Sequence, residues 1–202
     1  MRAAVSAFVA FSTIGLAGCV SVLPEQAVPN ALYRLGAITP TDELSRTVVV
    51  REPTSVRVLG GQGMVVEGAD GGLRLIQNVE WAGRLTRLMQ RGLVEALSGD
   101  GEGVAVTELT GVPGALEVSW HISDMTISGG NAVCDLDVTV LNGRTREPLA
   151  TRVIRESLPL GGDRAEDRAR ALSGVGSDCL ESAAQFIADV SQETAEATPP
   201  PA

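Results

Sequence analysis

Three consecutive runs between residues 116 and 158 have the length of strands, and the alternation of apolar with polar side chains in the first two limits the possible folds more than any other feature. The apolar positions of the first two runs are Leu116, Val118, Trp120 and Ile122, and then Cys134, Leu136, Val138 and Val140. A period of two predicts β-strands with one buried face and one face in water. Turns at 129–131 and 142–148 and a third strand at 149–158 predict an antiparallel meander.

Two amphipathic helices are expected to cover the buried face of this sheet. Over residues 80–97, a rotation of about 100° per residue places the large apolar side chains on one half of a helix. Arg84, Arg87 and Arg91 fall on the other half. A second apolar stripe runs from 172 to 190, and the glycines within it predict that this helix begins only near Ser177.

Shorter strands are expected on both sides of the first helix. The β-favouring runs lie at 32–37, 47–51, 63–67, 73–77 and 104–108. The order strands, helix, strands, helix predicts the α+β class. The expected architecture is a two-layer sandwich, with a mostly antiparallel sheet and two amphipathic helices on one face.

The N-terminus has the pattern of a secretory leader. Arg2 precedes a mostly apolar stretch of about 14 residues, which is too short for a bilayer that needs roughly 20. The tetrad LAGC at 16–19 resembles the bacterial lipobox, in which the cysteine is acylated and the leader is cut before it. We therefore expect a signal peptide over 1–18 and lipidation of Cys19. The alternatives are an ordinary signal with a coincidental cysteine, or an apolar N-terminal helix.

The mature chain is expected to hold one folded domain between two appendages. Residues 19–31 comprise the lipidated Cys19 and a tether with two prolines. Residues 32–192 are long enough for one α+β domain. Residues 193–202 contain three consecutive prolines and little to bury, so we expect a disordered tail.

Charge argues against nucleic acid as a partner. The chain has 25 acidic and 16 basic residues, a net charge of -9, and no lysine. Proteins that bind nucleic acid gain most of their affinity by neutralising phosphates with cations.

The sequence indicates no catalytic residues, no metal site and no cofactor. The single histidine, His121, lies on the outward side of a strand and is expected to be solvated rather than a general base. Asp135 and Asp137 share the wet face of the next strand, where ordinary charged alternation and a cation site are both open. The glycine runs match no phosphate-binding loop.

The chain resembles the ABC-type transport auxiliary lipoprotein family. The resemblance is carried by the LAGC tetrad, by Tyr33-Arg34-Leu35, and above all by VEWAGRL at 79–85 followed by LMQRGLVEAL at 88–97. The glycine-rich segment 60–72 and the arginine stripe depart from the family pattern. The family fold has a similar meander and a similar closing helix.

The resemblance implies a non-enzymatic accessory of an intermembrane lipid transport system. An ABC transporter would lie in the inner membrane, an MCE-domain protein would bridge the periplasm, and this lipoprotein would dock that bridge. Some members of the family assemble as rings, so a homo-oligomeric ring is a further expectation. The alternatives are an envelope-assembly lipoprotein, or a lipid-anchored hydrolase with an unrecognised site.

Two further expectations concern the cellular location of the protein and its contact surface. Val20 follows Cys19, and the aspartate that favours inner-membrane retention is missing, so we expect the outer membrane, facing the periplasm. Arg84, Arg87 and Arg91 are a candidate face for a partner or for lipid headgroups, and a solvated helix face is the alternative.

Cys134 and Cys179 are a candidate disulfide. Cys134 shares strand parity with buried residues, and Cys179 lies within the apolar stripe of the second helix. Both side chains should point into the same interface, and the periplasm permits a bridge. The alternative is two buried thiols, because the distance between the Cα atoms decides whether a bridge can form.

Overall fold

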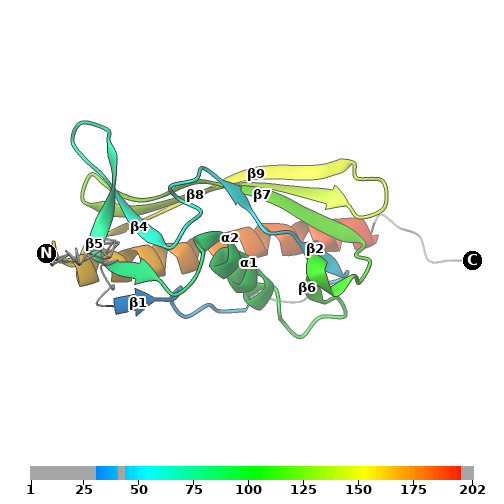
Figure 1. Cartoon of the computed structure of the whole chain (residues 1–202). Helices are drawn as coiled ribbons and strands as arrows, with labels where there is room; N and C mark the ends of the chain where they lie inside the picture. Colours follow the sequence, from blue (N-terminus) through cyan, green and yellow to red (C-terminus); the bar gives the residue numbers. More distant parts are fainter. Residues whose placement is uncertain (1–30, 41–43, 197–202) are drawn as a thin grey trace, which may run out of the picture.

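The computed structural model describes residues 31–40 and 44–196, which form one curled mixed sheet and two long helices (Figure 1). In chain order the elements are β1 (Ala31–Tyr33), β2 (Val48–Val50), β3 (Thr54–Ser55), β4 (Gly63–Glu67), β5 (Leu73–Trp81), α1 (Leu85–Ala96), β6 (Ala105–Thr107), the 3-10 helix η1 (Glu108–Thr110), β7 (Leu116–Ser128), β8 (Asn131–Asn142), β9 (Pro148–Pro159) and α2 (Ala165–Glu196).

β7, β8 and β9 form the antiparallel meander that the alternation predicts. A β-bulge between Ile122 and Asp124 changes which residues of β7 face the core. Ile122 is buried before the bulge, and Met125 and Ile127 are buried after it. The bulge therefore lets a single strand of 13 residues keep one apolar face although its simple alternation ends at Ile122.

The rest of the sheet is mixed, and the expectation of a mostly antiparallel sheet is not confirmed. Parallel pairs join β1 to β5, β2 to both β6 and β7, β3 to β7, and β4 to β7. β2 shows the physical reason, because Val48, Val49 and Val50 are all buried. An uninterrupted apolar run is typical of a strand between two parallel neighbours.

The two helices occupy different places against the sheet. α2 lies along the meander, and α1 packs on α2 near the β2 and β6 end of the sheet (Figure 1). Two helices placed side by side on one sheet face are therefore not confirmed. The Leu35 side chain fills the contact between the helices: a Cβ at Gly92 of α1 would lie 2.9 Å from its Cδ1, and one at Gly176 of α2 would lie 2.8 Å from its Cδ2.

α2 is longer than the glycines predict. It begins at Ala165 rather than near Ser177 and contains both Gly174 and Gly176. Each glycine lowers the intrinsic stability of the helix, but Gly176 allows the close approach of Leu35. Tertiary packing therefore offsets the loss. The helix also continues through Glu196, beyond the predicted end of the domain at 192, and 197–202 lie outside the described residues.

α1 is shorter than its periodicity predicts, because Trp81 ends β5 instead of starting the helix. Trp81 is paired with Tyr33 of β1, and its backbone N–H donates to the carbonyl of Gln62 at 2.7 Å. The indole remains in the core, with 1% of its surface exposed. The residue was correctly expected to be buried, but on the wrong kind of element.

Candidate functional site

The arginine stripe is displayed by the solvent side of α1. The other side of the helix anchors it, because Leu85, Met89 and Leu93 are fully buried in the core. Arg84 precedes the helix as its N-cap residue, and the N–H of Leu85 donates to the carbonyl of Gly61 at 2.8 Å. Arg84, Arg87 and Arg91 are all exposed, as the periodicity predicts.

The three arginines do not share one environment. Arg87 is paired with Glu52, with 3.3 Å between Nε and Oε2. Arg84 lines a hollow of about 500 Å³ together with Arg57 and Glu52. Arg91 lines a different groove, of about 520 Å³, beside Arg34. Arg84 and Arg91 thus line two different depressions, one at the start of α1 and one beside the segment 34–38.

A buried polar network beneath α1 was missed by the sequence reasoning. The hydroxyl of Thr86 donates to Glu52 Oε1 at 2.7 Å, and the Gln90 amide donates to the Val50 carbonyl at 3.0 Å and to Glu108 Oε2 at 2.5 Å. Thr86 and Gln90 are each only 4% exposed. Their spacing of four places them on one side of the helix, which is the signal that could have revealed a polar contact at this end of α1.

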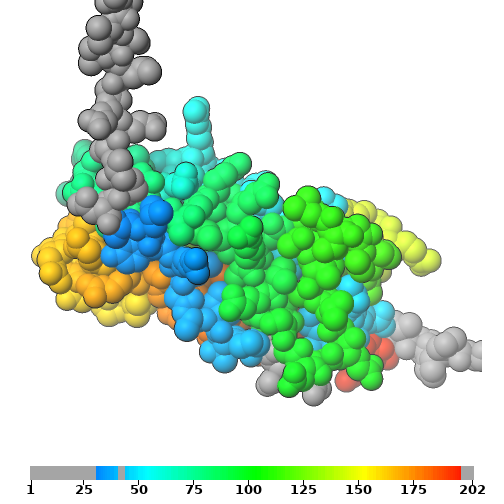
Figure 2. Space-filling view, turned by 60° about the horizontal axis from the view of Figure 1, so that its bottom comes forward, coloured from blue at the N-terminus to red at the C-terminus, as the bar shows by residue number. Residues whose placement is uncertain are grey.

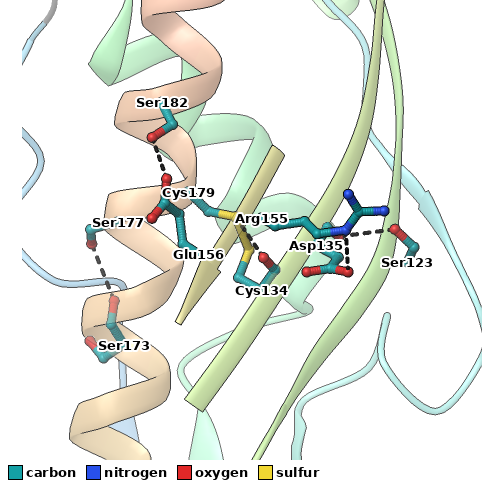
Figure 3. The surroundings of a disulfide bond; sticks show 9 residues. All are labelled: Ser123, Cys134, Asp135, Arg155, Glu156, Ser173, Ser177, Cys179 and Ser182. Carbon is teal, nitrogen blue, oxygen red and sulfur yellow. Dashed lines mark hydrogen bonds and ion pairs between the residues drawn. A yellow bond between two sulfur atoms is a disulfide. The ribbon is translucent and has the colours of Figure 1, made fainter. Parts of the chain in front are cut away.

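Cys134 of β8 and Cys179 of α2 are joined by a disulfide in the structure (Figure 3). Their Cα atoms are 6.4 Å apart, within the range that a disulfide spans, and both side chains are fully buried. Beside the bridge, Ser182 of α2 donates to Glu156 of β9 at 2.6 Å. The disulfide therefore attaches α2 to β8, the central strand of the meander.

A buried carboxylate, Glu117, joins three segments of the chain. Glu117 of β7 accepts hydrogen bonds from Arg51, which follows β2, and forms an ion pair with Arg146 of the β8–β9 turn. Its side chain is 9% exposed. Burial acts to raise the pKa of Glu117, but the hydrogen bonds and charges of Arg51 and Arg146 outweigh it and hold that pKa below its usual value.

The depressed pKa of Glu117 predicts an acid-sensitive contribution to stability. Glu117→Gln should lower the free energy of unfolding by about 1 to 2 kcal/mol at pH 7. A carboxylate with a lowered folded-state pKa stabilises above its ordinary pKa and loses that effect as the pH falls through the folded value. The difference between wild type and variant should therefore shrink as the pH drops below 4.5. Urea titrations at a series of pH values measure it.

Asp70→Asn is the matched control, because Asp70 pairs with Arg74 only at the exposed surface. It should leave stability nearly unchanged at every pH. A Glu117→Gln difference that is constant from pH 7 to pH 3 would contradict the assignment.

His121, Asp135 and Asp137 lie on the outer face of the sheet, and local contacts hold the first two. Thr54 Oγ1 and His121 Nδ1 are 2.8 Å apart, and Arg155 Nε lies 3.4 Å from Asp135 Oδ2. Asp137 is exposed. In the part of the chain that the structure describes, no group of three or more His, Cys, Asp or Glu residues could hold a metal ion.

Cys19, the predicted signal peptide over 1–18 and the predicted tether up to residue 30 lie outside the described residues. Of the helices within 31–40 and 44–196, none combines the length and apolarity that a membrane span requires.

A family model matches residues 33–188, described as the ABC-type transport auxiliary lipoprotein component. The chain belongs to this family. The match covers most of the chain, including α1 and the arginine stripe, and the suspected resemblance is confirmed. Membership of the auxiliary lipoprotein family implies an envelope protein anchored to a membrane and associated with ABC-type transport. It is not a known enzyme family.

Solved structures share the fold of the auxiliary lipoprotein. A crystal structure of a DUF330-family protein from Xanthomonas campestris matches with a TM-score of 0.74 at 15% identity, over 82% of this chain and 99% of that one. A second, described only as an uncharacterized protein, matches with a TM-score of 0.63 at 16% identity, over 79% and 99% of the two chains. No curated protein matches the sequence significantly.

Proposed function

We propose that this auxiliary lipoprotein serves an MCE/ABC-type intermembrane lipid transport system and has no catalytic activity of its own. The family match over residues 33–188 is the observation that carries the proposal. The protein would be acylated on Cys19 and anchored in the outer membrane with its folded domain in the periplasm. Val20 after the lipidated cysteine supports the outer rather than the inner membrane.

The proposed role is to dock the MCE-domain protein that bridges the periplasm. A docking role requires a rigid folded domain held near the membrane. The Cys134–Cys179 bridge and the two ion pairs of Glu117 both supply rigidity. The Arg84, Arg87 and Arg91 face remains a proposed contact surface, with a protein partner at Arg84 and Arg87 and headgroups at Arg91. We also expect a homo-oligomeric ring, which analytical ultracentrifugation in detergent would detect.

Deletion of the gene tests the proposed function. We expect the deletion to impair envelope lipid homeostasis, measured as increased sensitivity to detergent and altered phospholipid content of the outer membrane. Wild-type protein should restore both, as should His121→Ala, because no step depends on the imidazole. A hydrolase activity of the purified protein that His121→Ala or Thr54→Ala abolishes would contradict the proposal and favour a lipid-anchored enzyme.

A further inference from the structure

We propose that the groove between residues 34–38 and α1 binds the headgroup of an anionic phospholipid, an inference that rests on the proposed function in lipid transport. The main lining side chains of this Arg34–Arg91 groove are Arg34, Leu35, Ile38, Leu88, Arg91 and Glu95. Its volume is about 520 Å³, within the range of roughly 300 to 1,000 Å³ that is typical of ligand pockets. Figure 2 shows the face where the segment and the helix lie side by side.

The charge of the groove fits a phosphodiester. Arg34 and Arg91 bring two guanidinium groups to it against the single carboxylate of Glu95. Neither arginine forms an ion pair with another residue in the described part of the chain, so both remain available to a ligand. Guanidinium groups bind phosphate oxygens through paired hydrogen bonds. The chain as a whole has a net charge of -9 and repels anions, so a local positive site directs an anion to this groove.

The apolar part of the groove fits the lipid next to its headgroup. Leu35, Ile38 and Leu88 are partly buried and pack against the core, so each still offers apolar surface to the groove. A free inorganic phosphate would gain nothing from these side chains. The glycerol backbone and first acyl carbons of a phospholipid would bury apolar surface there, at about 25 cal/mol per Å². The combination therefore favours a lipid over a simple anion.

The wall of the groove is held in place before any ligand binds. The Gly36 N–H donates to the carbonyl of Ser173 on α2 at 3.0 Å, and the Ser173 hydroxyl donates to the carbonyl of Arg34 at 2.6 Å. The N–H of Thr39 donates to Glu181 Oε1 at 2.7 Å. These contacts tie both ends of the segment to α2. A preformed site avoids the ordering cost that weakens binding by mobile segments.

The position of the groove in the chain brings it within reach of a membrane. Ala31, the first residue of β1, follows Cys19 by 12 residues. A chain of that length extends about 40 Å at most. The wall of the groove begins three residues after Ala31, so acylation of Cys19 would keep the groove close to headgroups.

The hollow at the start of α1 is the natural control. It also contains two arginines, Arg57 and Arg84, but its lining has no leucine or isoleucine side chain and it includes the carboxylate of Glu52. That carboxylate already accepts from Thr86 and pairs with Arg87. An anion there would be opposed by Glu52, and the glycerol and acyl carbons of a lipid would meet none of the branched aliphatic side chains that line the Arg34–Arg91 groove.

Photo-crosslinking of the full lipidated protein in non-ionic detergent tests the proposal. The probe is phosphatidylglycerol with a photoactivatable group near the head of one acyl chain, and mass spectrometry maps the labelled residues. We expect labelling at 34–38 and on the adjacent side of α1. Arg34→Gln with Arg91→Gln should reduce it about tenfold or more, whereas Arg57→Gln with Arg84→Gln should leave it unchanged.

Two competitors identify the ligand class. The same probe with a phosphatidylcholine head should label the groove several-fold less, and 10 mM inorganic phosphate should not displace the phosphatidylglycerol probe. Displacement by phosphate would show a simple anion site and overturn the assignment to lipid. Equal loss of labelling in both double variants would show a diffuse basic surface and would also overturn it.

A parallel assay separates this proposal from the proposed function. The same variants are tested for recovery of an MCE-domain protein from cells. Absence of groove labelling in wild-type protein that still recovers the MCE-domain protein would refute the headgroup site alone. Absence of both would refute the proposed function as well. Thermal unfolding should match wild type in both double variants, because all four arginines are exposed.

Discussion

Cys19→Ser should abolish acylation and leave the leader uncut, because the lipobox reaction begins at the cysteine thiol. In the proposed lipoprotein, several acyl chains would hold the N-terminus, and each buried methylene would contribute about 0.8 kcal/mol to membrane binding. A serine at this position removes all of that anchoring energy. We expect wild-type protein to begin at Cys19 with a mass raised by its acyl groups, and the variant to keep residues 1–18.

Intact-mass spectrometry and membrane fractionation measure this result. Ser21→Ala is the matched control, because it changes a nearby small polar residue and should leave acylation complete. Wild-type protein with an unmodified residue 19 that is wholly soluble after cell breakage would refute the anchor. The Cys19→Ser variant should also fail to restore the envelope of the deletion strain.

Removal of the Cys134–Cys179 bridge should cost about 4 kcal/mol of stability. The two cysteines are separated by 45 residues, and the chain-entropy model assigns a loop of that length roughly this effect. We expect Cys134→Ala, Cys179→Ala and the double variant to lose similar amounts, because one bond is broken in each. Urea titration under oxidising conditions measures the difference.

Reductant provides the control for the bridge. When the titrations contain reductant, the difference in free energy of unfolding between wild type and the double variant should become smaller. It should equal only the cost of truncating two buried side chains. Alkylation without prior reduction should modify neither cysteine in denatured wild-type protein from the periplasm. Alkylation of both would show that the bridge is absent in the cell and that the residues act as buried thiols.

The sequence predicts where the strands and helices lie in the chain better than it predicts which strands pair with one another. β4 has the predicted bounds, 63–67, and the meander follows from alternation. Alternation reports which face of a strand is buried, but it does not report which strand lies beside it. The parallel pairs of β2 with β6 and β7 depend on contacts between distant segments. The apolar run Val48–Val50 is typical of a strand buried between parallel neighbours, but it does not identify which strands those neighbours are.

The helix ends show where tertiary structure overrides local propensity. Gly176 weakens the helix signal, yet it lies within α2 because Leu35 needs the space that a side chain would fill. Trp81 fits the apolar side of a helix, yet its pairing with Tyr33 keeps it in β5. In both cases the deciding contact comes from the segment 33–35, far away in the chain.

The candidate site was only partly visible for the same reason. Helical periodicity groups Arg84, Arg87 and Arg91, because they share one element. No periodicity connects Arg91 with Arg34, which the fold places in one groove. Cys134 and Cys179 could be named as a pair from their burial, whereas the distance between their Cα atoms required the structure.

Cross-linking in intact cells followed by affinity purification is the most direct test of the claim that this lipoprotein serves an MCE/ABC-type transport system. Tagged wild-type protein should recover an MCE-domain protein, with components of an ABC transporter at lower yield. The Cys19→Ser variant should recover several-fold less of both. If correctly acylated, folded wild-type protein recovers no MCE-domain protein from cells that express one, the claim is wrong.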